Sequence, residues 1–295
     1  MKPLEGKVAV VAGSSRGAGR GIALALGDAG AIVYVTGRTA RAGPKPADGA
    51  PGTIDETAEE VTARGGKGIP VRVDYTVEAE VAALFERVKR EHGKLDVLAT
   101  AVWGGADAFA SADAWMSAWG KPFWDQPSRQ WQCMMTAGAF AYFIAGYYAA
   151  RMMAAAGKGL IVGVTDGIVG EAKTPEYGGG QLVWDLAHAS INRLMQDMAI
   201  EGKPHHIAVI TLMPGFMQTE RVLMHMKTEE MKKMFRFDLS ESTLYIGRAV
   251  AGLAADPQVL EKTGKIHFVA ELAREYGFTD ADGRFIPKWE CVEAR

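Results

Sequence analysis

Short apolar runs alternate with longer amphipathic stretches along most of the chain. Seven of the runs have the length and composition of buried strands: 8–12, 31–36, 68–73, 97–101, 160–164, 207–213 and 266–270. Strands that are apolar on both faces fit a parallel sheet covered by helices on each side. Because right-handed crossovers join such strands, the pattern predicts an α/β fold, a doubly wound parallel sheet of seven strands with helices on both faces.

Three stretches exceed what this alternation requires. Residues 40–53 are rich in proline and glycine, residues 103–127 carry a cluster of Trp and Phe side chains, and a tail runs from 271 to 295. No low-complexity linker divides the chain, so we expect a single domain over residues 1–295. The aromatic insertion leaves the carboxyl end of a strand, where open α/β sheets bind ligands. It either lines an apolar substrate pocket or packs beneath the tail or a neighbouring subunit.

The first strand runs into a glycine-rich turn and then into a helix. Gly13, Gly17 and Gly19 are spaced G-x-x-x-G-x-G within residues 8–25. Gly13 permits a tight turn after the strand. Gly17 and Gly19 let the backbone approach a pyrophosphate at the helix N-terminus, where N–H groups and the helix dipole favour anions. A strand, a glycine loop and a helix in this order predict a Rossmann-type dinucleotide site.

Two arginines indicate which dinucleotide binds there. Arg16 lies in the glycine loop, and Arg38 follows the second strand, where NAD-preferring enzymes place an acidic residue for the ribose hydroxyls. No Asp or Glu lies between residues 33 and 39. A guanidinium can bind a 2′-phosphate through two hydrogen bonds, so we expect NADP(H) rather than NAD(H).

Further motifs follow in order and together resemble the short-chain dehydrogenase/reductase family over nearly the whole chain. They lie at residues 35–39, 73–76, 93–98, 159–162 and 214–219. The tail from Glu271 through Arg284 is similar to the end of one subgroup, dehydrogenase/reductase SDR family member 1. The resemblance implies an oxidoreductase with a nicotinamide cofactor.

The resemblance also implies cofactor-binding positions outside the glycine loop. Asp74 matches the family residue that hydrogen-bonds the adenine amino group, and Pro214, Gly215 and Thr219 match the loop that holds the nicotinamide carboxamide. The expected cofactor contacts are Gly13, Ser15, Arg16, Gly17, Gly19, Arg38, Thr39, Asp74, Tyr75, Gln181, Pro214, Gly215 and Thr219. We expect no metal site.

The family's catalytic positions are largely altered in this chain. The family uses Asn, Ser, Tyr and Lys, with Tyr as acid/base, Ser orienting the substrate carbonyl, Lys assisting the Tyr and Asn holding a water molecule. Carried over residue by residue, the tyrosine is Tyr177, the lysine is Gln181 and the asparagine is Gly138. The serine falls on Asp166, or on Thr165 if the register shifts by one residue. The candidate catalytic residues are therefore Tyr177, Asp166, Thr165 and Gln181.

Loss of the lysine favours one reaction direction. A cation about 4 Å from a phenol stabilises the phenolate by roughly 4 kcal/mol at an effective dielectric of 20, and Gln181 keeps only hydrogen-bonding capacity. A neutral Tyr177 can donate a proton to a developing alkoxide but cannot be the base for alcohol oxidation. We therefore expect reduction to dominate, with Asp166 as the alternative acid if burial keeps it protonated. Lys173 is expected on the surface and His188 in the core.

Residues 131–150 carry no charge, and this length matches the ~20 residues of a membrane span. Its glycines, tyrosines and other polar residues lower its hydrophobicity, so we expect no membrane span but a buried helix that contacts a second subunit in a homodimer or homotetramer.

Bulk composition narrows the remaining possibilities. The chain has two cysteines among 295 residues, which fits a reducing compartment, and we expect no signal peptide; both favour a cytoplasmic location. A net charge of −2 gives no reason to expect a nucleic-acid partner.

Three functions compete at this point. The first is an NADPH-dependent reductase of a bulky apolar carbonyl or imine, which the subgroup resemblance favours. The second is a non-catalytic NADP(H)-binding protein, which the altered tetrad favours. The third is a lyase or isomerase that uses Asp166 and Tyr177 as an acid/base pair.

Overall fold

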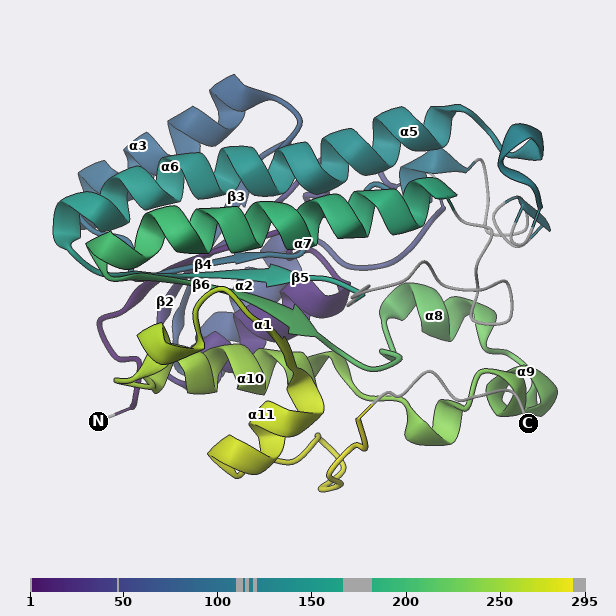
Figure 1. The fold of residues 1–295 in the computed structure, drawn as a ribbon. Coiled ribbons are helices and arrows are strands. Elements are labelled where there is room, and N and C mark those ends of the chain that lie inside the picture. The colour runs from purple at the N-terminus through teal and green to yellow at the C-terminus, as the bar shows by residue number, and fades with distance from the viewer. Residues whose placement is uncertain are drawn as a thin grey trace.

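The computed structural model describes residues 2–46, 48–109, 114, 117–118, 121–166 and 182–288. Seven parallel strands form one sheet in the order β3-β2-β1-β4-β5-β6-β7. The strands are β1 Val8–Ala12, β2 Ile32–Gly37, β3 Lys67–Arg72, β4 Val97–Thr100, β5 Gly159–Val164, β6 Ile207–Met213 and β7 Ile266–Phe268. This sheet, with helices on both sides (Figure 1), confirms the predicted fold class.

Helices cover both faces of the sheet as two layers (Figure 1). One layer consists of α1 Gly17–Asp28, α2 Ile54–Ala63, α10 Thr243–Ala255 and α11 Val269–Tyr276. The other consists of α3 Glu78–His92, α6 Ala141–Ala156 and α7 Leu182–Gly202. Alternate residues of β1 serve the two layers, because Ala9 and Val11 pack in the first core and Val8 and Val10 in the second.

Shorter helices and turns connect the strands and the long helices. They are α5 Arg129–Met134, the π-helix Met135–Phe140, α8 Glu220–His225, α9 Glu229–Met234 and the 3-10 turns Ala106–Ala108, Phe123–Asp125, Lys203–His205, Phe237–Leu239 and Val259–Lys262.

The predicted strands agree with the observed ones except at the two edges of the sheet. The predicted strand over 266–270 is wrong at its carboxyl end, because β7 stops at Phe268 and Val269 begins α11. Val269 and Ala270 are buried as helix residues, and a short apolar run does not distinguish a buried strand from a buried helix. At the opposite edge, β3 is only partly buried and contains Pro70, a residue that edge strands tolerate.

The uncharged stretch forms one continuous helix from Arg129 to Ala156. It is the one helix in the described ranges that is long and apolar enough to cross a membrane, and half of its most apolar window is buried within the protein. Ala145, Ala149 and Met153 belong to the core beneath it.

The strand order reverses between β1 and β4, and the connections that follow these two strands lead to helices on opposite faces of the sheet. Open α/β sheets bind ligands at such a position.

Candidate functional site

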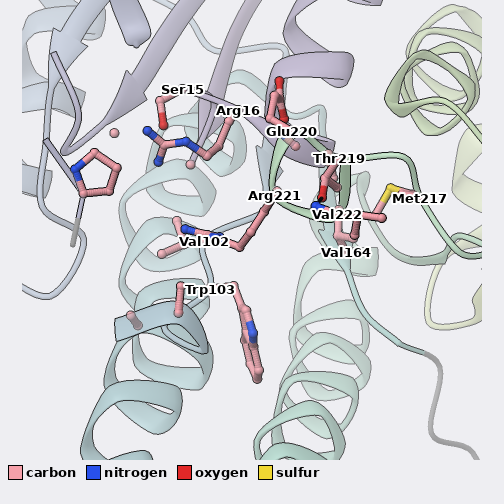
Figure 2. A pocket seen from close by; sticks show the side chains of 18 of the residues that line it. Ser15, Arg16, Val102, Trp103, Val164, Met217, Thr219, Glu220, Arg221 and Val222 are labelled. Atoms are coloured by element: carbon pink, nitrogen blue, oxygen red, sulfur yellow. Dashed lines mark hydrogen bonds between the residues drawn. The ribbon is translucent and has the colours of Figure 1, made fainter. Parts of the chain in front are cut away.

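A cavity of about 1060 Å³ opens at the carboxyl edge of the sheet, at the upper end of the range for small-molecule pockets. Loops that follow β1 to β6 all contribute to its wall. Most expected cofactor residues line it: Gly13, Ser15, Arg16, Gly17, Arg38, Thr39, Asp74, Tyr75, Pro214, Gly215 and Thr219. Figure 2 shows Arg16 towards one end of the cavity, Trp103 towards the other and Arg221 between them.

The glycine loop has the close approaches that its sequence predicts. Gly13 has a φ of +77°, and a Cβ atom there would lie 2.9 Å from the Ala101 carbonyl oxygen. Gly19 lies within α1 and not among the lining residues. A Cβ atom on Gly19 would lie 2.2 Å from the Gly13 carbonyl oxygen, so this glycine lets the helix pack on the loop.

A carboxylate of the protein already sits at the N-terminus of α1. The Gly17 N–H donates a 2.6 Å hydrogen bond to Oε2 of Glu220, and Oε1 of the same side chain lies 3.3 Å from the Arg20 guanidinium. This contact satisfies one of the backbone donors that begin the helix. A phosphate at this helix end therefore has to use the neighbouring amides.

The expected 2′-phosphate arginines both line the cavity, and both have partners. Arg16 donates to the carbonyl oxygens of Pro51 and Gly52, at 2.9 and 2.8 Å. Arg38 Nη2 lies 2.5 Å from Oδ2 of Asp107. Burial lowers the pKa of Arg38, but the hydrogen bond and charge of Asp107 outweigh it and produce a net rise.

Two further arginines that line the cavity, Arg72 and Arg221, were missed by sequence reasoning. Arg72 pairs with Glu80, and Arg221, which belongs to α8, forms an ion pair with Asp48 of the proline- and glycine-rich loop. Burial lowers the pKa of the nearby Arg16, and the charge of Arg221 lowers it further. Asp48, Asp107 and Arg221 belong to no local motif, and only the folded chain brings them to the glycine loop.

At the expected adenine end, Asp74 is held in a defined orientation. Its Oδ1 accepts hydrogen bonds from the Thr76 N–H at 2.9 Å and the Thr76 hydroxyl at 2.7 Å, an arrangement typical of Asp in turns. Tyr75 is buried, and its hydroxyl lies 2.7 Å from the hydroxyl of Thr36. Burial raises the pKa of Tyr75 well above its ordinary value.

The Pro214–Thr219 loop is held by a buried carboxyl group. Glu241 is 1% exposed, and its Oε2 accepts a 3.0 Å hydrogen bond from the Gly215 N–H. Its backbone N–H donates to the Phe216 carbonyl and its carbonyl accepts from the Gln218 N–H, at 2.9 and 2.8 Å. Burial raises the pKa of Glu241 to about 8. No sequence motif pointed to this residue.

The structure places only part of the altered tetrad. Tyr177, Gln181 and Lys173 lie outside the described residues. Thr165 and Asp166 both line the cavity directly after β5. Oδ2 of Asp166 accepts a 2.9 Å hydrogen bond from the Trp184 indole N–H.

His188 combines the expected burial with a place in the cavity wall. It is 7% exposed, and its ring packs against Trp103 with a centroid distance of 4.2 Å. Its Nδ1 lies 3.7 Å from Oδ2 of Asp166 and 3.0 Å from the Trp184 carbonyl oxygen. Because a carbonyl oxygen only accepts, Nδ1 carries the hydrogen of this bond.

Two departures from the family pattern are spatially linked. Gly138 takes the place of the family asparagine, and a Cβ atom there would lie 3.3 Å from Cζ3 of Trp103. The resemblance aligns residues 100–103 of this chain with the family's Asn-Asn-Ala-Gly block after the fourth strand, so Trp103 takes the place of the glycine. The indole thus packs against the position from which the asparagine side chain would project.

The aromatic side chains of the insertion lie in different environments. Trp103 lines the cavity, whereas Phe109 is buried in a satellite core with Met134 and Ala187. Phe123 and Trp124 are exposed. Trp115 and Trp119 lie outside the described residues.

These residues fit a dinucleotide. A glycine cradle, four arginines and an oriented aspartate line the cavity. Apolar side chains line much of the remainder, including Val102, Trp103, Tyr142, Val164, Met213, Met217, Phe235 and Trp184. No cluster of metal-ligating side chains occurs among the described residues.

Comparison with known proteins agrees with this geometry. The sequence model for short chain dehydrogenases matches residues 7–231. Dehydrogenase/reductase SDR family member 1 from Mus musculus is 39% identical over 294 residues, covering 96% of this chain and 86% of the relative.

Solved structures share the fold. A short chain dehydrogenase from Mycobacterium thermoresistibile superposes with a TM-score of 0.76 at 20% identity, covering 98% of this chain and 92% of that one. A 7α-hydroxysteroid dehydrogenase, complexed with NADH and 7-oxo glycochenodeoxycholic acid, has a TM-score of 0.69 at 24% identity, covering 90% and 93% of the two chains.

Proposed function

The chain belongs to the short-chain dehydrogenase/reductase family, and on this premise we propose that it is an NADP(H)-dependent reductase of an apolar carbonyl or imine. Family membership makes it an oxidoreductase. The finer proposal rests on one observation: Arg16, Arg38 and Arg221 line a cavity whose wall is largely apolar. The arginines suit a phosphorylated ribose, and the apolar wall suits a substrate with little polar surface.

When bound, the nicotinamide cofactor supplies a hydride. The chain's own residues bind and orient. Arg38 would exchange its contact with Asp107 for the 2′-phosphate, Asp74 would accept from the adenine amino group, and the Pro214–Thr219 loop, held by Glu241, would contact the carboxamide. The apolar wall excludes water from the reacting centre. Tyr177 donates the proton that an alkoxide requires, without the help that a lysine at position 181 would give.

The proposed cofactor preference is tested by titration of the purified protein with NADPH and with NADH. We expect NADPH to bind at least tenfold more tightly, which corresponds to about 1.4 kcal/mol. Arg38→Ala removes most of this preference. Arg41→Ala is the matched control, because Arg41 is three residues away, is exposed and pairs with Glu59 outside the cavity wall. Equal affinities in the wild type, or an undiminished preference in Arg38→Ala, would overturn the proposal.

We also propose that the protein is a homodimer or homotetramer. Phe140, Phe143 and Tyr147 are exposed on one side of the helix from Arg129 to Ala156, and Leu182 and Leu186 are exposed on α7, which lies beside α6 in Figure 1. Apolar side chains that gather in this way on a monomer mark an interaction surface.

A further inference from the structure

The carboxyl group of Asp166 gives the reacting end of the cavity an unusual polarity. In the register that aligns Asp166 with the family serine, the family places a hydroxyl at this position, which donates a hydrogen bond to a carbonyl oxygen. A carboxylate only accepts hydrogen bonds, and its charge opposes the negative charge that develops when a ketone becomes an alkoxide. Asp166 lines the cavity directly after β5 and is fixed by the 2.9 Å hydrogen bond from Trp184. The site therefore disfavours the substrate group that the family's serine serves.

The groups around Asp166 favour positive charge. The indole rings of Trp103 and Trp184 line the same wall, with a centroid distance of 4.8 Å, and indole faces attract organic cations. The arginines that line the cavity contact other groups: Arg16 the Pro51 and Gly52 carbonyls, Arg38 Asp107, Arg72 Glu80 and Arg221 Asp48; Lys45 and Lys227 also line the cavity. The titratable neighbour that faces Asp166 from α7 is His188, whose Nδ1 lies 3.7 Å away.

From this geometry we infer that the substrate is a cation at its reacting group, a protonated imine of an apolar amine, with Asp166 as its counterion. This inference rests on the proposed reductase function and names its substrate class. A carboxylate beside the C=N bond raises the pKa of the imine nitrogen and so favours the iminium form. Trp103 and Trp184 line the wall beside Asp166, and the apolar wall accommodates the hydrocarbon part.

The chemistry of an iminium matches the residues that this chain has lost. Reduction adds a hydride to the imine carbon, and the π electron pair of the C=N bond becomes a lone pair on nitrogen. The positive charge is neutralised in the same step, and the amine later takes a proton from water. NADPH is the reductant, as proposed above. No proton donor is required during hydride transfer to an iminium ion. Replacing the family lysine by Gln181 and the serine by Asp166 therefore does not raise the barrier of this reaction, whereas it would raise the barrier for a ketone.

Equilibrium binding tests the inference without relying on turnover. The probes are 2-phenylpiperidine, which is an ammonium ion at pH 7, and 2-phenylcyclohexanone, a neutral ring of similar size. Each is titrated calorimetrically into the wild-type protein, with and without saturating NADP⁺. We expect the ammonium ion to bind at least tenfold more tightly than the ketone. Equal binding, or tighter binding of the ketone, overturns the inference whatever the variants do.

Two substitutions locate the preference. Asp166→Asn keeps the shape of the side chain and is expected to bring the affinity ratio close to one. Asp166→Ser restores the family residue and is expected to do the same, so the test survives if one variant fails to fold. Asp125→Asn is the control, because Asp125 belongs to the aromatic insertion and does not line the cavity. A preference that persists in both Asp166 variants, or that disappears in Asp125→Asn, contradicts the assignment.

The same samples separate this inference from the proposed function. If NADPH does not bind to the wild type, the reductase proposal fails, whereas the cation preference is still measured on the protein alone. If NADPH binds and the cation preference is absent, the protonated-imine assignment alone fails.

Discussion

At the residue scale, an acidic side chain of the cavity competes with the phosphate of the proposed ligand for Arg38. Asp107 lies 2.5 Å from Arg38, and both side chains are partly exposed in the cavity wall. A 2′-phosphate that binds Arg38 must displace this carboxylate or lie next to it, and like charges in proximity oppose each other. The pair therefore lowers the affinity that Arg38 alone would give.

Asp107→Asn is accordingly predicted to strengthen NADPH binding about three- to tenfold, or about 0.7–1.4 kcal/mol. NADH lacks the 2′-phosphate, so its affinity should stay within twofold of the wild type. Fluorescence titration of both nucleotides measures the effect. Asp125→Asn serves as the control, because Asp125 belongs to the same insertion but does not line the cavity. Weaker NADPH binding in Asp107→Asn would show instead that this carboxylate orients Arg38.

Glu241 gives a second prediction at this scale, concerning stability and pH. Burial raises its pKa from an ordinary value of 4.5 to about 8. As the pH rises from about 4.5 to 8, the folded protein keeps this proton while the unfolded chain loses it, so the free energy of unfolding falls over this window and levels off above it. Asp280 adds to the effect, because its negative charge also raises the pKa of Glu241. Burial raises the pKa of the neighbouring Tyr245, and the charge of Glu241 raises it further.

Glu241→Gln keeps an acceptor for the Gly215 N–H and has no proton to lose. At pH 8 its Tm should exceed that of the wild type by about 5 °C or more, given about 1.4 kcal/mol per pKa unit and roughly 2–4 °C per kcal/mol. At pH 5 the two should melt within about 2 °C of each other. Thermal unfolding followed by circular dichroism provides the measurement, with the exposed Glu261→Gln as control. A constant Tm difference at all pH values would remove the titration of Glu241 as its cause.

At the scale of elements, the structure shows which sides of the long helix from Arg129 to Ala156 are covered, which its sequence alone does not. Its uncharged run was compatible with a membrane span or a core helix, because composition alone does not reveal which sides are covered. In the fold, Ala145, Ala149 and Met153 are buried while Phe140, Phe143 and Tyr147 are exposed. The exposed residues are spaced three and four apart and therefore lie on one side of the helix.

Phe143→Lys tests whether this exposed side is a subunit contact. A charge that has to be buried without a partner is expected to shift the protein from its oligomer to a species of about 32 kDa, the mass of one chain. Light scattering coupled to gel filtration at micromolar concentration measures the change. Phe285→Lys is the control, because Phe285 is similarly exposed but belongs to the tail. A wild-type protein that already elutes as a single chain would rule out the proposed assembly.

At the scale of the whole molecule, the sequence predicts the sheet and the glycine cradle but not the cross-chain pairs. Strand positions follow from local apolar runs, and the loop at Gly13 follows from a local motif, so both can be read from neighbouring residues. The contact of Arg38 with Asp107 joins residues that are 69 positions apart, and the bond of Trp184 to Asp166 crosses residues 167–181. Such pairs depend on how helices, strands and loops pack against one another. The periodicity of apolar residues in the sequence does not encode this packing.

The substitutions of the family tetrad are similarly connected only in three dimensions. Gly138 and Trp103 each look like an isolated departure in sequence, yet the indole packs against that glycine. We expected His188 in the core, and its side chain is buried. The sequence did not predict which side chains surround it. Its approach to Asp166 depends on the placement of α7 against the end of β5.

The central claim, that this protein transfers a hydride from NADPH to an apolar carbonyl or imine, is tested most directly by isotope transfer. NADPH carrying two deuterium atoms at C4 of the nicotinamide is incubated with the protein and a panel of apolar cyclic imines and ketones, and the products are analysed by mass spectrometry. The account predicts one deuterium on the former C=N or C=O carbon of at least one product, with imines labelled faster than ketones of the same shape. Tight binding of NADPH without label in any product would contradict it.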